Sequence, residues 1–340
     1  MILSLSIFFV TSILMTHLFC RFAKNTRLMD KPNERSMHSI PTIRGGGAIF
    51  IGLSVLSLPF ISYFSKVPSN ELTFFILSIC LLSGVSFLDD LFQLSAKSRL
   101  AIQCLVGLIV ALFLRPEILD LMLFPITNFF LIFMFLLVAV IWSINHFNFM
   151  DGMDGFCALQ ALFILVSYAL FLNQNPDAIP YQEYCMVLGV GLLGFLIFNF
   201  PPARLFMGDV GSASLGLISF MIAVVAQKKF NIPLGYWFVL NGLFLFDATI
   251  TLIRRALNKE KCFSAHKKHA YQRLKQQGVS TRVILLGQAI VNLIFLSLIF
   301  LVEKNEIGFL ALFGLQFFIL ISIYILIEIK HPMFAVNVSH

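Results

Sequence analysis

Residues 125–143 of the chain read PITNFFLIFMFLLVAVIWS, a run without one charged side chain. A helix needs about 20 mostly apolar residues to cross the hydrocarbon core of a bilayer. The run is long and continuously apolar, whereas a strand of a membrane barrel would show about ten residues of weak alternation. It therefore predicts a transmembrane helix, and the fold class depends on how many such runs the chain holds.

Runs of this kind fill most of the 340 residues. The chain is 59% hydrophobic and 12% charged, whereas a soluble domain carries about 25% charged residues. We predict an all-α polytopic membrane protein, a single domain over residues 1–340 with about eleven transmembrane helices. The candidate spans are residues 2–20, 46–64, 72–88, 100–114, 125–143, 156–172, 184–199, 213–227, 235–253, 283–302 and 307–327.

The basic residues predict the orientation of these spans. Of the 24 Lys and Arg residues, 19 fall on one side of the predicted membrane, and loops rich in Lys and Arg stay in the cytoplasm. We therefore expect the N-terminus outside and the C-terminus in the cytoplasm. The net charge of +7 then reports topology and gives little support to a nucleic-acid partner. The loops assigned to the cytoplasm are residues 21–45, 89–99, 144–155, 200–212 and 254–282, and they are the predicted active-site face.

Acidic residues collect at the predicted cytoplasmic ends of the spans, where ionisable groups suggest function by default. Asp89 and Asp90 close one span and are followed by Lys97. Two adjacent carboxylates repel each other unless a cation or a proton relieves them. The pair alone is also compatible with a solvated helix end, so its weight depends on the neighbouring groups.

A second polar group recurs every third residue, at Asn145, Asn148, Asp151 and Asp154. In a helix this spacing keeps neighbours on one side, and the glycines at positions 152 and 155 then break the helix. The pattern predicts a row of oxygen ligands beside exposed backbone. Capping of two helices is the structural alternative, although four such groups at a regular step make it less favoured.

Asp209 lies in the third group, Gly-Asp-x-Gly-Ser, which opens the next span. A helix N-terminus with small residues suits an anionic ligand or a phosphate bridged by a metal, and Asp209 would be the metal ligand. A plain helix cap is the alternative, because Asp and Ser are both favoured there.

Histidines and basic residues complete the set. His266 and His269 are three residues apart, so both can face one site, and basic neighbours suit a diphosphate or anionic lipid headgroups. Arg44 precedes three glycines, where a guanidinium and backbone amides can approach a phosphate together. Asp247 lies inside a span, either buried with a partner or at the rim of the site.

Together these groups supply oxygen ligands, paired carboxylates and phosphate-binding bases, the equipment of Mg²⁺-assisted phosphoryl transfer. A transporter is the main alternative from another class, but its acids would lie near the bilayer midplane and its halves would be repeated. An accessory protein with an inactive site is the second alternative. It would lack one of the expected residue types, and none is missing.

The same four motifs, in this order, resemble those of the polyprenyl-phosphate N-acetylhexosamine-1-phosphate transferases. The matching pieces cover nearly the whole chain: Asp89-Asp90 with Lys97, residues 145–155, residues 206–212 and the histidine loop. This superfamily includes phospho-N-acetylmuramoyl-pentapeptide transferase and undecaprenyl-phosphate N-acetylglucosaminyl-1-phosphate transferase. The resemblance implies transfer of a sugar 1-phosphate from a UDP-N-acetylhexosamine to undecaprenyl phosphate, with release of UMP.

The resemblance also implies roles for the motif residues. Asp209 and Asn148 would hold Mg²⁺, or Mn²⁺ in its place. Asp89 and Asp90 would orient or deprotonate the lipid phosphate, and His266 and His269 would bind phosphate as part of the catalytic set. The expected substrate-binding residues are Asn145, Asp151, Asp154, Lys97 and Arg44.

One departure from the family pattern bears on the donor. The pentapeptide transferases carry three consecutive histidines in the last long loop, and this chain has only His266-Lys-Lys-His269. This favours the branch that starts O-antigen or other surface glycans from UDP-GlcNAc or a 6-deoxy sugar, and the pentapeptide donor is the alternative. The implied place is the bacterial inner membrane, with the site facing the cytoplasm, and a homodimer is the assembly left open.

Overall fold

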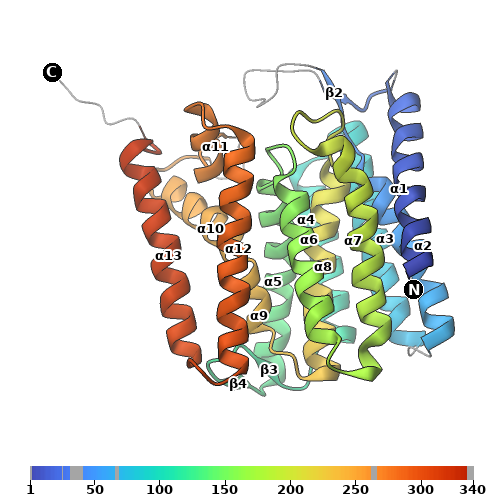
Figure 1. The fold of residues 1–340 in the computed structure, drawn as a ribbon, viewed down its shortest axis with the longest axis vertical. Coiled ribbons are helices and arrows are strands. Elements are labelled where there is room, and N and C mark those ends of the chain that lie inside the picture. Colours follow the sequence, from blue (N-terminus) through green and yellow to red (C-terminus); the bar gives the residue numbers. More distant parts are fainter. Residues whose placement is uncertain (1, 25, 31–40, 66–68, 262–265, 335–340) are drawn as a thin grey trace. The chain divides into compact units, whose positions relative to one another are not determined.

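The computed structural model describes residues 2–24, 26–30, 41–65, 69–261 and 266–334. Parts of two predicted cytoplasmic loops, residues 31–40 and 262–265, lie outside these ranges. The chain divides into two compact units, Met1–Trp237 and Phe238–His340, and each is described by itself. Both consist of helices joined by loops and, within unit 1, by two very short hairpins (Figure 1).

Unit 1 contains most of the long helices. Its hairpins pair Met29–Asp30 (β1) with Thr42–Ile43 (β2) and Leu119–Asp120 (β3) with Pro125–Ile126 (β4), both antiparallel. Its helices are α1 Ile2–Ala23, α2 Gly47–Ser65, α3 Ser69–Phe92, α4 Ala96–Ile109, the π-helical turn η1 Val110–Leu114, α5 Phe129–Phe149, α6 Phe156–Leu172, the short turn η2 Pro176–Ala178, α7 Ile179–Asn199 and α8 Asp209–Phe230.

Unit 2 begins within α9 and is also helical. Its elements are α9 Gly235–Leu240, α10 Gly242–Leu257, α11 Ala270–Gln276, α12 Thr281–Glu303 and α13 Phe309–Lys330. The predicted span 235–253 is therefore not one helix, because the chain breaks at Asn241. Within unit 2, the Gln316 amide on α13 donates to the Val239 carbonyl beside this break, at 2.8 Å. A side chain thus satisfies a carbonyl that an unbroken helix would have paired.

The predicted all-α membrane fold is confirmed. Helices occupy the predicted apolar runs, and eight helices of the described residues are long and apolar enough to cross a membrane by length and composition. The helix predicted over residues 125–143 has different ends in the structure. Its first residues form β4, and α5 starts at Phe129, capped by Asn128, and continues to Phe149. The number of spans and the orientation stay predictions.

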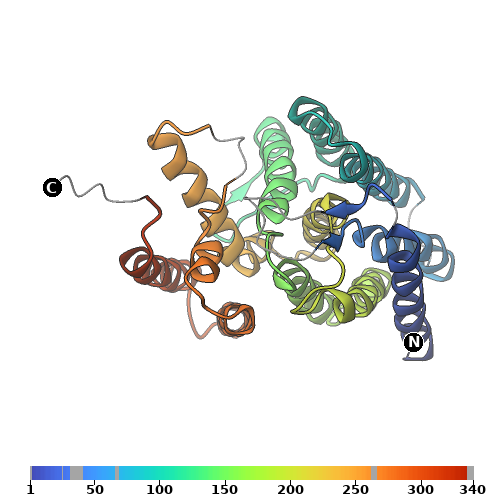
Figure 2. The same ribbon diagram turned by 90° about the horizontal axis from the view of Figure 1, so that it is seen from above.

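Helix α8 is the core of unit 1. It packs against α2, α3, α5 and α6, which surround it in Figure 2, and 94% of its apolar stretch is buried. Small residues permit this close approach. A side chain at Gly216 would place its Cβ 2.3 Å from the Ser143 carbonyl oxygen on α5. The backbones of α5 and α8 therefore approach closely about two turns after the start of α8.

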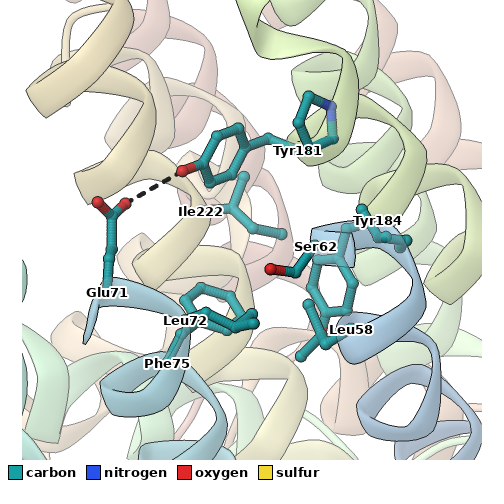
Figure 3. Close-up of a pocket in the computed structure, with 10 residues that line it drawn as sticks. Leu58, Ser62, Glu71, Leu72, Phe75, Tyr181, Tyr184 and Ile222 are labelled. Carbon is teal, nitrogen blue, oxygen red and sulfur yellow. Dashed lines mark hydrogen bonds between the residues drawn. The ribbon is translucent and has the colours of Figure 1, made fainter. Parts of the chain in front are cut away.

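Helices α3 and α8 run antiparallel and are linked at both ends. At one end, Lys229 of α8 pairs with Glu71 of α3 at 2.9 Å, and the Tyr181 hydroxyl donates to Glu71 at 3.2 Å. Figure 3 shows the hydrogen bond between Tyr181 and Glu71 at the edge of an apolar pocket lined by Leu72, Phe75 and residues of α2 and α7. Asp90 lies about 28 Å further along α3, so the pocket is remote from the acidic end.

We expect Gly216→Ala to lower the free energy of unfolding by about 1–3 kcal/mol, because the added methyl group must push α5 away. The measurement is the apparent melting temperature in detergent. Gly84→Ala on α3 is the matched control, since a Cβ at Gly84 meets nothing within 4 Å. Equal melting temperatures for the two variants would contradict the close packing of α5 on α8.

Candidate active site

The loops at one end of unit 1 are joined by backbone hydrogen bonds. The amides of Gly46 and Gly47 donate to the carbonyls of Phe206 and Met207 at 3.0 and 2.9 Å, and the Phe206 amide donates to Ile43. A Cβ at Gly47 would lie 2.2 Å from the Gly211 Cα. The glycine run was expected to bring its amides to a phosphate. Instead, the amides of Gly46 and Gly47 bind the loop before α8. The absence of a side chain at Gly47 lets the backbone pack directly against the start of α8.

Asp90 caps helix α8 from another helix. Its two carboxylate oxygens accept from the backbone amides of Asp209 and Val210, each at 3.1 Å, and its side chain is 1% exposed. A Cβ at Gly208 would lie 2.6 Å from Asp90 Oδ2, so the glycine permits this approach. Arg44 donates from Nη2 to the Asp90 carbonyl. Both oxygens of Asp90 are thus committed to the helix N-terminus, where unpaired amides need acceptors.

Asp89 points to a different partner. Its Oδ1 accepts from the Leu94 amide at 2.6 Å, and its Oδ2 lies 3.1 Å from Arg99 Nη1. The same nitrogen of Arg99 lies 3.5 Å from Asp209 Oδ2. The acids of α3 and α8 therefore share one guanidinium group. From the sequence, Lys97 and not Arg99 was named as the basic site residue after this acidic pair. The available signal for Arg99 was its position ten residues after Asp89, in the first turn of the next helix.

The oxygen-rich wall opposite these acids comes from α5 and the loop after it. Asn148 donates from Nδ2 to Ser212 Oγ at 3.3 Å and also lies against Asp209. Asp151 interacts with Ser212 as well. Burial, reinforced by the charges of Asp209 and Asp90, raises the pKa of Asp151 well above its usual range. Three carboxylates and two neutral side chains with oxygen atoms therefore lie close together at the start of α8. They are Asp90, Asp151, Asp209, Asn148 and Ser212.

Asp154 and Asn199 connect the loops around this region. Asp154 Oδ2 accepts from the Ala203 amide at 3.0 Å. The Asn199 side chain accepts from the Gly155 amide at 3.0 Å and donates to the Leu205 carbonyl at 2.9 Å. Asn199 lies in an apolar helix end without a motif, so the sequence offered no signal for it.

The predicted row of polar groups is only partly helical. Helix α5 ends at Phe149, so Asn145 and Asn148 lie on the helix, whereas Asp151 and Asp154 follow in the loop before Gly155, whose φ is +75°. The break predicted at Gly152 and Gly155 therefore comes slightly earlier, and Asp151 already lies in the loop. Asn145 forms a reciprocal amide pair with Gln103 of α4, the shorter contact being 2.7 Å. Lys97 is exposed in the first turn of α4.

The predicted histidines belong to unit 2. The ring centroids of His266 and His269 lie 4.9 Å apart, so the two imidazoles are neighbours, as their spacing predicted. Burial beside His269 and Arg255 lowers the pKa of His266 to about 4. His266 is therefore neutral at pH 7 and can accept a hydrogen bond from a protonated group.

Asp247 is the buried residue that positions this loop. Its carboxylate accepts from the Ala270 amide at 2.9 Å and from Thr251 Oγ1 at 3.1 Å, and its Oδ1 lies 3.6 Å from His269 Nδ1. Of the two roles that the sequence left open for Asp247, the structure shows the first: it is buried with a partner. It fixes the start of α11 and the ring of His269 together.

The donor set in unit 1 suits a hard divalent cation. Carboxylate, amide and hydroxyl oxygens are the ligands that Mg²⁺ takes in proteins, and Asp209, Asn148, Asp151 and Ser212 supply them. The Asp209 side chain is 35% exposed, so a cation can reach it. In the described ranges, no three His, Cys, Asp or Glu side chains have the spacing of a bound metal site. Arg99 lies between two of the acids, Asp89 and Asp209.

This fold and site define a helical membrane protein with a cluster of acidic side chains at one end of unit 1, and the comparisons name its family. The sequence model of the family described as Glycosyl transferase family 4 matches residues 72–227 of this chain. This range includes every acid of the cluster. Together with the relative described next, this match shows that the chain belongs to that family.

Three relatives show the range of the similarity. The chain is 30% identical over 329 residues to a probable undecaprenyl-phosphate N-acetylglucosaminyl 1-phosphate transferase of Bacillus subtilis, covering 94% of this chain and 89% of that one. It is 28% identical over 268 residues to an undecaprenyl-phosphate alpha-N-acetylglucosaminyl 1-phosphate transferase of Thermotoga maritima, covering 78% and 77%. It is 28% identical over 264 residues to a phospho-N-acetylmuramoyl-pentapeptide-transferase of Streptococcus sanguinis, covering 72% and 78%.

We expect Asp90→Asn to lower the free energy of unfolding by about 1–3 kcal/mol, because an amide leaves one N–H of α8 facing another donor. Thermal unfolding in detergent measures this. Asp89→Asn is the matched variant and should cost less, since its amide oxygen can still accept from Leu94 and it loses only a pair with the exposed Arg99. Equal losses for the two variants would contradict the capping role of Asp90.

Because the pKa of His266 is lowered, the stability of the protein should depend on pH. Its folded-state pKa is about 4 and its ordinary value 6.5, so between these values the unfolded chain binds a proton that the folded chain excludes. The free energy of unfolding should therefore fall as the pH is lowered from 6.5 towards 4. Melting curves across this window should show a smaller loss for His266→Gln than for the natural chain. Parallel losses would show that His266 does not contribute.

Proposed function

We propose that the chain is a polyprenyl-phosphate phosphosugar transferase, which moves an N-acetylhexosamine 1-phosphate from a UDP-sugar to undecaprenyl phosphate and releases UMP. The observation that carries the proposal is the meeting of Asp89, Asp90, Asp151 and Asp209 at one end of unit 1, in a chain of this family. Phosphoryl transfer relies mostly on positioning and charge neutralisation, and a carboxylate cluster that binds a cation provides both.

In the proposed reaction, a phosphate oxygen of the lipid attacks the phosphorus that bears the sugar. The bond from that phosphorus to the oxygen shared with the uridine-bearing phosphate breaks, and this oxygen leaves as part of UMP. The product is a lipid diphosphate sugar. Direct attack inverts the configuration at phosphorus, whereas a route through an aspartyl phosphate retains it, so a chiral phosphate distinguishes the two.

The two adjacent acids have different parts in this proposal. Asp89 faces an exposed partner, Arg99, and we assign it to orient or deprotonate the lipid phosphate. Both carboxylate oxygens of Asp90 accept hydrogen bonds from backbone amides of α8, and we assign Asp90 to position Asp209. Asp151 and Asp154 flank the region where the nucleotide is proposed to bind, and Lys97, exposed in α4, is free to reach a phosphate.

Asp209 and Asn148 are the residues proposed to hold Mg²⁺, with Mn²⁺ as an alternative ion. When bound, such a cation neutralises charge on the diphosphate of the donor and makes UMP a better leaving group. The protein's part is to hold the oxygens in place: the first turn of α8 fixes Asp209, and the Ser212 contact orients Asn148.

For the donor we propose a UDP-N-acetylhexosamine without a peptide, such as UDP-GlcNAc. Similarity to the N-acetylglucosaminyl relatives extends over 94% of the chain in one case, and the histidine loop lacks three consecutive histidines. The product would start O-antigen or another envelope glycan, at the cytoplasmic face of the bacterial inner membrane. The streptococcal relative supports the alternative, a UDP-MurNAc-pentapeptide donor.

The transporter alternative receives less support. A coupled ion pathway would place unpaired acids along the spans. The acids of unit 1 discussed above lie at one helix end, and Glu71, at the other end of α3, is paired with Lys229. Family membership points to the same class of function as the acidic cluster.

The test uses purified protein with Mg²⁺, undecaprenyl phosphate and a panel of UDP-N-acetyl sugars, followed by UMP release and mass spectrometry of the lipid. We expect a lipid diphosphate sugar from one donor. Asp209→Asn should reduce turnover at least about a hundredfold, because the ligand for the cation is weakened, while the protein stays folded. Near-normal turnover of the variant at saturating Mg²⁺ would rule out this role for Asp209.

A further inference from the structure

A guanidinium group lies between two carboxylates of the cluster, where a cation of the proposed reaction would have to bind. Arg99 Nη1 is 3.1 Å from Asp89 Oδ2 and 3.5 Å from Asp209 Oδ2. The acids come from α3 and α8, and Arg99 comes from the first turn of α4. One positive charge thus joins three helices at the centre of the proposed site.

The acids of the cluster outnumber the guanidinium groups that are paired with them. When ionised, Asp89, Asp90, Asp151 and Asp209 carry four negative charges. In the described part of the chain, the guanidinium groups paired with them are those of Arg44 and Arg99. The remaining difference equals the charge of one divalent cation. A divalent cation would match that difference for four ionised acids, and a proton on Asp151, whose pKa is raised by burial, would reduce it.

The two arginines differ in how firmly they are held. Arg44 is 26% exposed and donates to a backbone carbonyl that stays in place whatever the acids bind. The Arg99 side chain is 43% exposed, and the contacts described for it are with the two carboxylates. Exposed ion pairs are weak, because water screens them and a long side chain must be ordered to form them. Arg99 can therefore leave Asp209 at little cost.

We propose that Arg99 is a resident counter-ion, which holds Asp89 and Asp209 together in the metal-free protein and gives up Asp209 to the divalent cation. The proposal rests on the proposed function, since it presupposes that Asp209 binds a metal. It makes Arg99 a positioning residue: the arginine keeps two like charges from pushing α3 and α8 apart before the ion arrives. It also makes the bound ion and the Arg99 pair with Asp209 mutually exclusive.

The test is thermal unfolding of the full chain in detergent, without substrates, first in EDTA and then across a Mg²⁺ titration. Arg99→Gln should melt lower than the natural chain in EDTA, because the two acids lose their shared cation. It should bind Mg²⁺ about three to ten times more tightly, because no arginine competes for Asp209. Arg99→Lys keeps the charge and should retain an affinity near that of the natural chain. Arg282→Gln, an exposed arginine at the start of α12, is the control for loss of one charge.

The outcomes separate the counter-ion from the metal site. An Arg99→Gln protein that melts in EDTA like Arg282→Gln would overturn the counter-ion role, and weaker Mg²⁺ binding would show that Arg99 supports the ion instead of competing with it. Equal Mg²⁺ affinities for Arg99→Gln and Arg99→Lys would exclude competition by charge. If the natural chain gains no stability from Mg²⁺ while it still releases UMP in the donor assay, the exchange fails and the transferase proposal stands.

Discussion

A carboxylate from α3 closes the N-terminus of the buried helix α8, and the geometry of the acidic cluster depends on that contact. The first amides of a helix have no partner within it and need acceptors. Asp90 accepts from two of them, and a glycine at position 208 lets it come close enough. Because Asp209 and Ser212 lie in the first turn of α8, whatever fixes this helix end also fixes the oxygens that face Asn148 and Asp151.

Adjacent acids on one helix acquire different tasks through direction alone. Successive residues of a helix point about 100° apart, since a turn takes about 3.6 residues. Asp90 therefore faces α8 and is buried by it, while Asp89 faces α4 and meets Arg99. No property of the sequence distinguishes the two, because they are the same residue type side by side. Only the placement of α4 and α8 around α3 makes one a cap and leaves the other beside an exposed partner.

The sequence predicted those features that depend on local pattern. Continuous apolar runs predicted the helices, and the Gly-Asp-x-Gly-Ser motif predicted that α8 begins at Asp209. The failures depend on contacts between distant segments. The break at Asn241 is relieved by an amide 75 residues away, on Gln316, and periodicity in one span cannot report such a partner. The role of Arg99 is likewise set by its distance to Asp209, over a hundred residues further along the chain.

The burial of α8 has a consequence for how the bilayer acts on this protein. Membranes of different thickness are accommodated by tilting or by local deformation at helices that touch lipid. Helix α1 has 11% of its apolar stretch buried, whereas α8 has 94% of its stretch buried by the rest of the protein. A change in lipid composition therefore affects the acidic cluster only through the helices that surround α8. The tilt of those helices can adjust, whereas the close glycine contacts of α8 limit any change in its own position. We therefore expect the acidic cluster to respond less to bilayer thickness than the outer helices do.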